Sequence, residues 1–130
     1  MKNLYTIILL TLLSLLMPSL AAAQSFQNVS IADASTVYSI AQDEQGIMWF
    51  GTDHGLYAYD GYRSIPHNTD ADGTPVITRV HSICIFKDIL YMATERGLMA
   101  YDIRRGRYAE RTSGGMGEMR AVTIYGGRLW

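Results

Sequence analysis

Ile47 to Asp60 reads I-M-W-F-G-T-D-H-G-L-Y-A-Y-D, and the rest of the chain can be interpreted outward from it. A weaker copy, I-L-Y-M-A-T-E-R-G-L-M-A-Y-D, runs from Ile89 to Asp102 at a constant offset of 42 residues. The block G-L-x-A-Y-D recurs in both copies. Self-similarity at a spacing of about 40 to 50 residues indicates a repeat architecture, in which each module packs against the next.

The repeat extends beyond this stretch in both directions. Upstream, V-x-S-I begins at Val37 and again at Val80, an offset of 43 residues, so the turn between the first two strands is one residue shorter in the second copy. Downstream, Met119 to Trp130 reads M-R-A-V-T-I-Y-G-G-R-L-W, the start of a third copy. We therefore expect two complete modules and the beginning of a third, at the front of a longer protein.

The predicted inner strands, I-M-W-F-G-T and I-L-Y-M-A-T, are apolar throughout and do not alternate with polar residues. Such a pattern predicts strands that are buried on both faces. A single sandwich would leave one face of each sheet exposed to solvent, whereas four-stranded sheets stacked around an axis bury both faces. The predicted fold class is therefore all-β: a partial β-propeller with two four-stranded antiparallel blades and the start of a third, after an N-terminal signal helix.

The expected organisation follows the repeat boundaries. It comprises a signal peptide (1–23), an N-terminal strand and turn (24–36), blade 1 (37–66), a loop (67–79), blade 2 (80–111), a second loop (112–118) and a truncated blade 3 (119–130).

The first residues resemble an export signal. Lys2 supplies a positive start, an almost wholly apolar run follows, and three alanines end at Ala23. Small residues at this place are what a signal peptidase accepts, and cleavage would leave Gln24 as the first residue. The alternative is an uncleaved membrane anchor, although the apolar run is short for a bilayer. We expect a mature protein in the periplasm or outside the cell.

Composition narrows the possible partners. The formal net charge of −1 gives no electrostatic attraction for nucleic acid or for an anionic membrane surface. The single cysteine, Cys84, excludes an internal disulfide framework and a cysteine-rich zinc site. The three histidines lack metal-ligand spacing, so neither a metal nor a cofactor is predicted.

Val37 to Gly61 fits V-x-S-I-x-x-D-x-x-G-x-x-W-F-G-T-x-x-G-L-x-x-Y-D-G and resembles the two-component regulator propeller repeat. The second copy departs from this pattern at Tyr91, Ala93 and Ile103. The resemblance implies the periplasmic sensor of a hybrid two-component histidine kinase, as found in gut Bacteroidetes. It also implies an oligosaccharide ligand bound by the complete propeller. The full-length parent would be a homodimer, attached to the inner membrane only through a helix downstream of this segment.

Most repeated positions have structural interpretations. Trp49 and Tyr91 are expected to be aromatic side chains packed between blades rather than platforms for sugar stacking. Gly51 is expected where neighbouring blades approach closely. The stretch from Ser39 to Trp49 also resembles the aspartate box of sialidase propellers, but its spacing differs by one residue.

Four loop residues are candidates for ligand contact. They occur as pairs at repeated positions, in turns that could line the mouth of the propeller: Asp53 with His54, and Glu95 with Arg96. No catalytic residue is predicted, and this segment is not expected to be an enzyme. Two other functions remain open: an exported propeller enzyme acting on glycans, such as a lyase or sialidase-like hydrolase, and a structural propeller for protein contacts.

Overall fold

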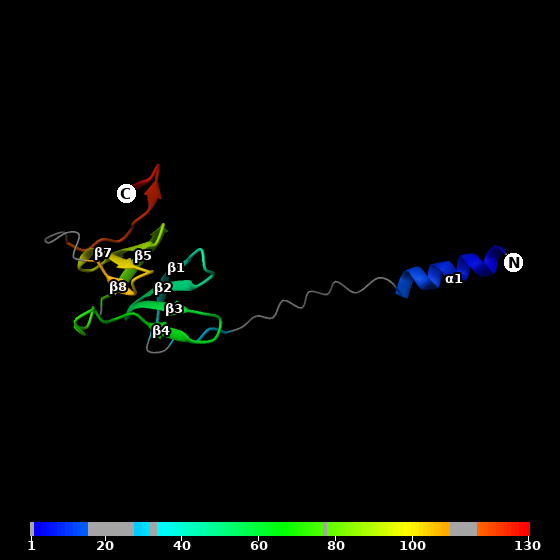
Figure 1. Cartoon of the computed structure of the whole chain (residues 1–130), viewed down its shortest axis with the longest axis horizontal. Coiled ribbons are helices and arrows are strands. Elements are labelled where there is room, and N and C mark those ends of the chain that lie inside the picture. The colour runs from blue at the N-terminus through cyan, green and yellow to red at the C-terminus, as the bar shows by residue number, and fades with distance from the viewer. Residues whose placement is uncertain (1, 16–27, 32–33, 77, 110–116) are drawn as a thin grey trace.

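The computed structural model describes residues 2–15, 28–31, 34–76, 78–109 and 117–130. The only helix in this part of the chain, α1 (Lys2–Leu15), lies apart from the sheets (Figure 1). No described helix has the length and hydropathy needed to cross a membrane. The cleavage site predicted between Ala23 and Gln24 lies outside the described residues, so its prediction stays open.

Two four-stranded antiparallel sheets form the body of the structure, and each is a simple meander. Blade 1 contains β1 (Val37–Gln42), β2 (Met48–Thr52), β3 (Gly55–Tyr59) and β4 (Ser64–Pro66). Blade 2 contains β5 (Val80–Phe86), β6 (Ile89–Thr94), β7 (Gly97–Asp102) and β8 (Arg107–Tyr108). A hairpin of β9 (Ile124–Tyr125) and β10 (Arg128–Leu129) follows.

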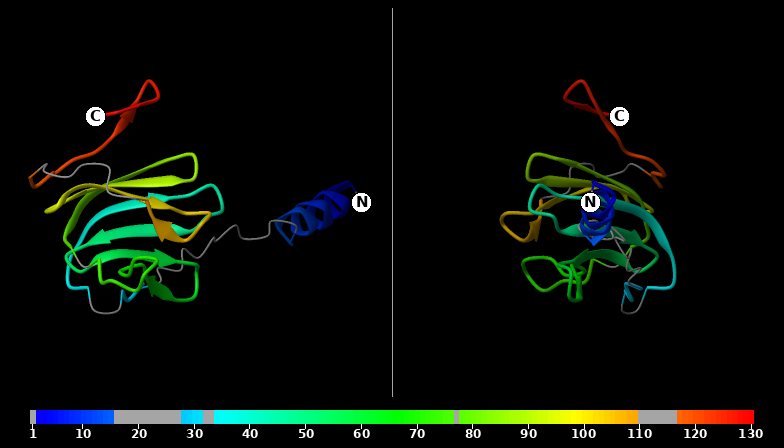
Figure 2. Two further views of the ribbon diagram at one scale, coloured as in Figure 1. Left: turned by 60° about the vertical axis from the view of Figure 1, so that its left-hand side comes forward. Right: turned by 90° about the vertical axis from the view of Figure 1, so that its right-hand side faces the viewer.

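The two blades are stacked on each other with their first strands, β1 and β5, side by side, and the hairpin follows beyond blade 2 (Figure 2). This arrangement confirms the predicted fold class of two antiparallel blades and the start of a third.

The two blades share their register as well as their strand order. Trp49 pairs with Ala58 in blade 1, and Tyr91 pairs with Ala100 in blade 2. Both first strands contain an irregularity after their opening valine, at Val37 in β1 and at Val80 in β5. The repeated sequence therefore specifies local irregularities as well as strands.

One detail differs from the sequence-based expectation. The strand expected within 24–36 is not formed by residues 28–31 or 34–36, and the rest of that range is not described. The outer strand β4 begins only at Ser64. The Asp60 carboxylate accepts hydrogen bonds from the amides of Tyr62 and Arg63, which keeps those two residues in the turn.

The interface between the blades is built from alternate residues of facing strands. Trp49 and Leu56 lie on the face of blade 1 that meets Val80, Met92 and Tyr101 of blade 2, and all five are buried. On the opposite face of blade 1, Phe50 is only 8% and Tyr57 only 2% exposed. The inner strands of blade 1 are therefore buried on both sides, as the continuous apolar pattern predicts.

Asp43 holds the turn between β1 and β2. Its carboxylate accepts hydrogen bonds from the amides of Gln45 (3.0 Å) and Ile47 (2.9 Å), and from the indole Nε1 of Trp49 (2.9 Å). The turn thus fixes both the hairpin and the orientation of the main interface aromatic. In blade 2 the corresponding turn is shorter, and Tyr91 takes the place of the tryptophan. The second copy therefore has no indole N–H at this position to donate to a turn carboxylate.

We expect Asp43→Ala to destabilise the protein by about 2 kcal/mol, because it leaves two amides and an indole N–H without their charged acceptor. Asp43→Asn should cost less, since one side-chain oxygen can still accept. Urea unfolding followed by circular dichroism measures both changes. Glu44→Ala, at the exposed neighbouring position, is the control. Equal stabilities of Asp43→Ala and Glu44→Ala would contradict the proposed role of the turn.

Candidate functional site

The candidate ligand residues lie in two equivalent turns, between β2 and β3 and between β6 and β7. In the first, the Thr52 hydroxyl donates to the Gly55 carbonyl (2.9 Å) and accepts from the His54 amide (3.0 Å). Thr94 makes the same two bonds in blade 2. Gly55 has a φ of +115°, a conformation that side chains with a Cβ rarely adopt. The repeated threonines and glycines therefore shape these turns.

Asp53 anchors the segment that leads into β1. Its carboxylate accepts hydrogen bonds from the Ser35 hydroxyl and from the amides of Ser35 (3.1 Å) and Thr36 (3.2 Å). The bond from the Ser35 hydroxyl is the main cause that holds the pKa of Asp53 well below its usual range. His54 Nδ1 lies 3.3 Å from the same carboxylate, and the His54 side chain is 53% exposed. Asp53 is thus already bound within the fold.

Glu95 and Arg96 occupy the matching places in blade 2. Glu95 Oε1 lies 3.0 Å from Arg79 Nη1, and the Arg79 guanidinium lies 5.9 Å from the centre of the Tyr38 ring. Glu95 is therefore paired with the residue that leads into β5 of its own blade, and Arg79 in turn contacts Tyr38 of blade 1. Arg96 instead lines a cleft. The other three candidates do not line this cleft, and a ligand role for any of the four remains a prediction.

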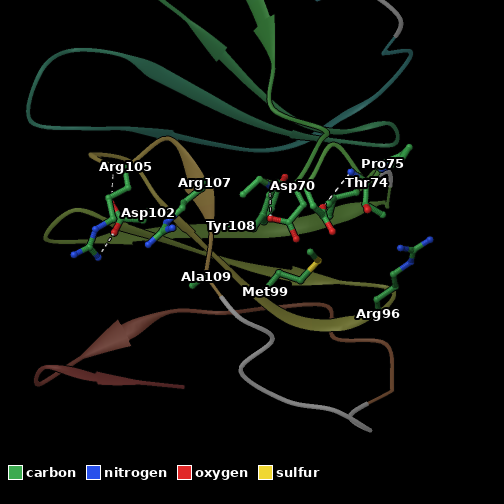
Figure 3. Close-up of a pocket in the computed structure, with 13 residues that line it drawn as sticks. Asp70, Thr74, Pro75, Arg96, Met99, Asp102, Arg105, Arg107, Tyr108 and Ala109 are labelled. Atoms are coloured by element: carbon green, nitrogen blue, oxygen red, sulfur yellow. Dashed lines mark hydrogen bonds and ion pairs between the residues drawn. The ribbon is translucent and has the colours of Figure 1, made fainter.

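The cleft has a volume of about 830 Å³ and lies between the loop 67–76 and the strands β7 and β8 (Figure 3). This volume lies in the range of typical small-molecule sites. One wall is the tip of the loop, and the other carries Arg96, Met99, Arg107 and Tyr108 from blade 2. Figure 3 shows Arg105 and Arg96 toward opposite ends, with Arg107 and Asp70 between them.

Hydrogen bonds attach the loop that forms this wall to blade 1. Asn68 donates from Nδ2 to the His54 carbonyl (2.9 Å) and accepts at Oδ1 from the Leu56 amide (3.0 Å). The loop closes on itself through the Asp70 amide, which donates to the Thr74 carbonyl (2.8 Å). The two walls of the cleft are thus attached to two different modules.

An aromatic cluster, consisting of Trp49, His67, Tyr101 and Tyr108, joins these modules. The Tyr101 hydroxyl lies 2.7 Å from His67 Nδ1, and the Tyr108 hydroxyl donates to the His67 carbonyl (2.5 Å). The Trp49 ring centre lies 5.1 Å from that of His67 and 5.6 Å from that of Tyr101. The interpretation of Trp49 as an interface aromatic is confirmed, since it is only 3% exposed. Tyr91, the equivalent residue in blade 2, is only half-buried.

His67 should make stability depend on pH. Burial lowers its pKa below the ordinary value of 6.5, so the unfolded chain takes up a proton at this residue before the folded chain does. The stabilising contribution is complete above the unfolded pKa and is lost as the pH falls below it, by at most about 1.4 kcal/mol per pH unit.

The midpoint of urea unfolding, measured from pH 7.5 to pH 5, should therefore fall more steeply for the native protein than for His67→Gln, which cannot titrate. The same slope in both proteins would show that His67 is not the group responsible.

Some charged side chains around the cleft have hydrogen-bond or ion-pair partners, and others do not. Asp102 accepts from the Arg105 amide (2.9 Å) and from its guanidinium (3.1 Å), and the amide bond is the main cause of its lowered pKa. Asp72 accepts from the Thr74 amide, which lowers its pKa as well. Among the described residues, Arg96 and Arg107 form no ion pair with a carboxylate. Two guanidinium groups therefore remain available at the cleft.

The sequence analysis missed most of this site. The range 67–79 was predicted only as a loop, and Arg105, Arg107 and Tyr108 were not singled out. One signal was present: the segment after β4 bears no resemblance to the rest of the repeat and carries His67, Asn68 and Asp70. Within the described residues, no group of three or more histidine, cysteine or carboxylate side chains is placed to hold a metal ion.

Two other titratable residues, His81 and Cys84, do not line this cleft. His81 contacts the Tyr38 ring, with 5.8 Å between the ring centres, and its Nε2 also lies 3.3 Å from Glu118 Oε1. Cys84 is half-buried, and burial raises the pKa of its thiol.

Stacked antiparallel meanders with matching registers define the chain as part of a β-propeller. Comparison with known proteins narrows the class, because residues 32–54 match the model of the two component regulator propeller family. No curated protein matches the chain.

Solved structures with the same fold come from B. thetaiotaomicron. The extracellular domain of BT4673, described in one structure as a one component system and in another as a hybrid two component system, is 32% identical, with a TM-score of 0.69. The alignment covers 82% of this chain and 14% of that one. The extracellular domain of the hybrid two component system BT3049 is 25% identical, with a TM-score of 0.64. That alignment covers 80% of this chain and 17% of the BT3049 domain.

Residues 32–54 are thus similar to a two-component regulator propeller repeat, and the chain shares the fold of these extracellular domains. The aligned part spans about a seventh of the length of the BT4673 domain.

Proposed function

We propose that this chain is the N-terminal part of the ligand-sensing propeller of a hybrid two-component sensor histidine kinase. The observation that carries the proposal is the likeness of 82% of the chain to an extracellular domain of such a system. Residues 1–23 would be the export signal, and the blades would lie in the periplasm or outside the cell. The parent protein would be attached to the inner membrane by a helix downstream of the blades.

The ligand in this proposal is an oligosaccharide, held by the complete propeller. The cleft supports this choice because it combines carboxylates, guanidiniums and the apolar side chains of Met99 and Tyr108. Sugars present hydroxyl groups and apolar ring faces together, and mixed linings of this kind suit them. The formal net charge of −1 gives no support to a role in binding nucleic acid.

Signalling would proceed by a shift of populations. A ligand that contacts both the loop 67–76 and blade 2 would favour the arrangement in which these walls are closest. Any such preference biases the equilibrium by the difference in affinity between the two arrangements. In a homodimer of the parent protein, the bias would pass through the membrane helix to the kinase.

The test is a binding survey with the complete ectodomain of the parent protein. Isothermal titration against oligosaccharides from dietary and host glycans should show binding, and chromatography should recover each ligand uncleaved. Cleavage of a bound oligosaccharide would contradict the proposed sensing function and favour an exported enzyme. Failure of every oligosaccharide to bind would overturn the proposed ligand class and favour a propeller for protein contacts.

A further inference from the structure

Arg96 and Arg107 give the cleft between the loop 67–76 and strands β7 and β8 an unsatisfied positive charge. Both side chains are exposed, and neither forms an ion pair with a described carboxylate. The third arginine of the cleft, Arg105, is held by Asp102 at 3.1 Å. An incoming anion would therefore find two guanidiniums that no described carboxylate occupies, and these can donate charge-assisted hydrogen bonds.

The opposite wall selects against a simple anion. Asp70 and Asp72 lie on the loop tip, and each accepts a bond from a backbone amide nearby, at Ala71 and Thr74 respectively. Both side chains are exposed, so each carboxylate can accept a further hydrogen bond from a ligand. A carboxylate attracts hydroxyl donors and repels anions. A ligand that fits this cleft therefore needs hydroxyl groups on the side facing the loop and negative charge on the side facing blade 2.

The remaining lining is apolar. Met99, Pro75 and Val76 border the cleft, and Tyr108 lies at its floor with only 8% exposure. Its hydroxyl is already used in the bond to the His67 carbonyl, so the ring offers mainly a surface for van der Waals contact. Sugar rings carry apolar C–H faces that pack well on surfaces of this kind.

We propose that this cleft binds an acidic oligosaccharide, whose carboxylates are held by Arg96 and Arg107 while its hydroxyl groups donate to Asp70 and Asp72. This assignment rests on the proposed sensing function and specifies the chemical class of its ligand. The separation of Arg96 and Arg107 along the cleft (Figure 3) suits a chain of several rings better than a single sugar. Such a ligand bridges blade 2 and the loop that Asn68 ties to blade 1.

The experiment compares matched ligands on the complete ectodomain of the parent protein. The probes are trisaccharides of galacturonate, glucuronate and mannuronate, each paired with its carboxyl-reduced neutral form. We expect at least one acidic probe to bind about tenfold more tightly than its neutral partner, which is the scale of one charge-assisted hydrogen bond. Its affinity should fall as salt is added, because the guanidiniums are exposed.

Substitutions then locate the site. Arg107→Gln and Arg96→Gln should each weaken binding of the acidic probe by about tenfold and leave the neutral probe nearly unaffected. The control is Arg104→Gln, an exposed arginine of the neighbouring turn that does not line this cleft. Unchanged thermal unfolding of the variants confirms that they are folded.

The outcomes separate the two proposals. Binding of neutral probes as tight as that of acidic ones, or acidic binding that survives both substitutions, would overturn the acidic ligand at this cleft and leave the sensing function intact. Failure of all six probes and of the wider oligosaccharide survey would overturn the sensing of oligosaccharides altogether and favour a propeller for protein contacts.

Discussion

Gly51→Val should prevent normal packing of blade 1 against blade 2 and destabilise the protein by about 3 kcal/mol. Gly51 lies mid-strand in β2, where a Cβ would come within 2.5 Å of Ser39 Oγ, 2.8 Å of Val80 Cγ1 and 3.1 Å of the Val80 carbonyl oxygen. Side chains could rotate away, but the backbone carbonyl requires the blades themselves to separate. Valine favours strands, so the loss would come from the interface and not from local propensity.

The matched control is Gly117→Val, because no atom lies within 4 Å of a Cβ placed at Gly117. Both variants are compared with the native ectodomain by thermal unfolding followed by circular dichroism. Gly117→Val should unfold close to the native temperature. If Gly51→Val did the same, Gly51 could not lie at a close approach between blades.

Trp49→Ala should have an effect of similar size, about 3 to 5 kcal/mol, which is usual for removal of a buried tryptophan. The indole contacts His67 and Tyr101, and its Nε1 donates to Asp43. Its loss would open a cavity in the aromatic cluster and leave the Asp43 carboxylate without one of its three donors.

Two further variants separate these contributions in urea unfolding experiments. Trp49→Phe keeps a ring in the cluster but loses the hydrogen bond, so it should cost about 1 to 2 kcal/mol. Tyr62→Ala removes an aromatic side chain that is 97% exposed and should have little effect. A stability of Trp49→Ala equal to that of Tyr62→Ala would place Trp49 outside the blade interface.

Much of the fold follows from local sequence rules that the repeat makes visible. The continuous apolar runs at 47–52 and 89–94 predict strands buried on both faces, and Phe50 and Trp49 show this burial on opposite sides of β2. Gly55 and Gly97 predict turns with positive φ, and both have it. Such features depend on residues a few positions apart, so one sequence is sufficient to find them.

The cleft could not be found in the same way. Its walls come from a loop and from strands about 30 residues further along the chain. No sequence pattern indicates how far apart these two segments lie in space. Asn68 shows the difficulty: its role depends on bonds to His54 and Leu56, more than ten residues earlier. Asp53 is the converse case, a loop carboxylate whose hydrogen bonds within the fold become visible only in three dimensions.

The central claim is that successive 42-residue modules stack face to face. A double-mutant cycle between Trp49 and Tyr101 tests it most directly, because these rings come from different blades and their centres lie 5.6 Å apart. With Trp49→Leu, Tyr101→Leu and the double variant in the complete ectodomain, we predict a coupling free energy of about 1 kcal/mol. Stability losses that add to within about 0.3 kcal/mol would show that the rings do not touch, and would contradict the stacked blades.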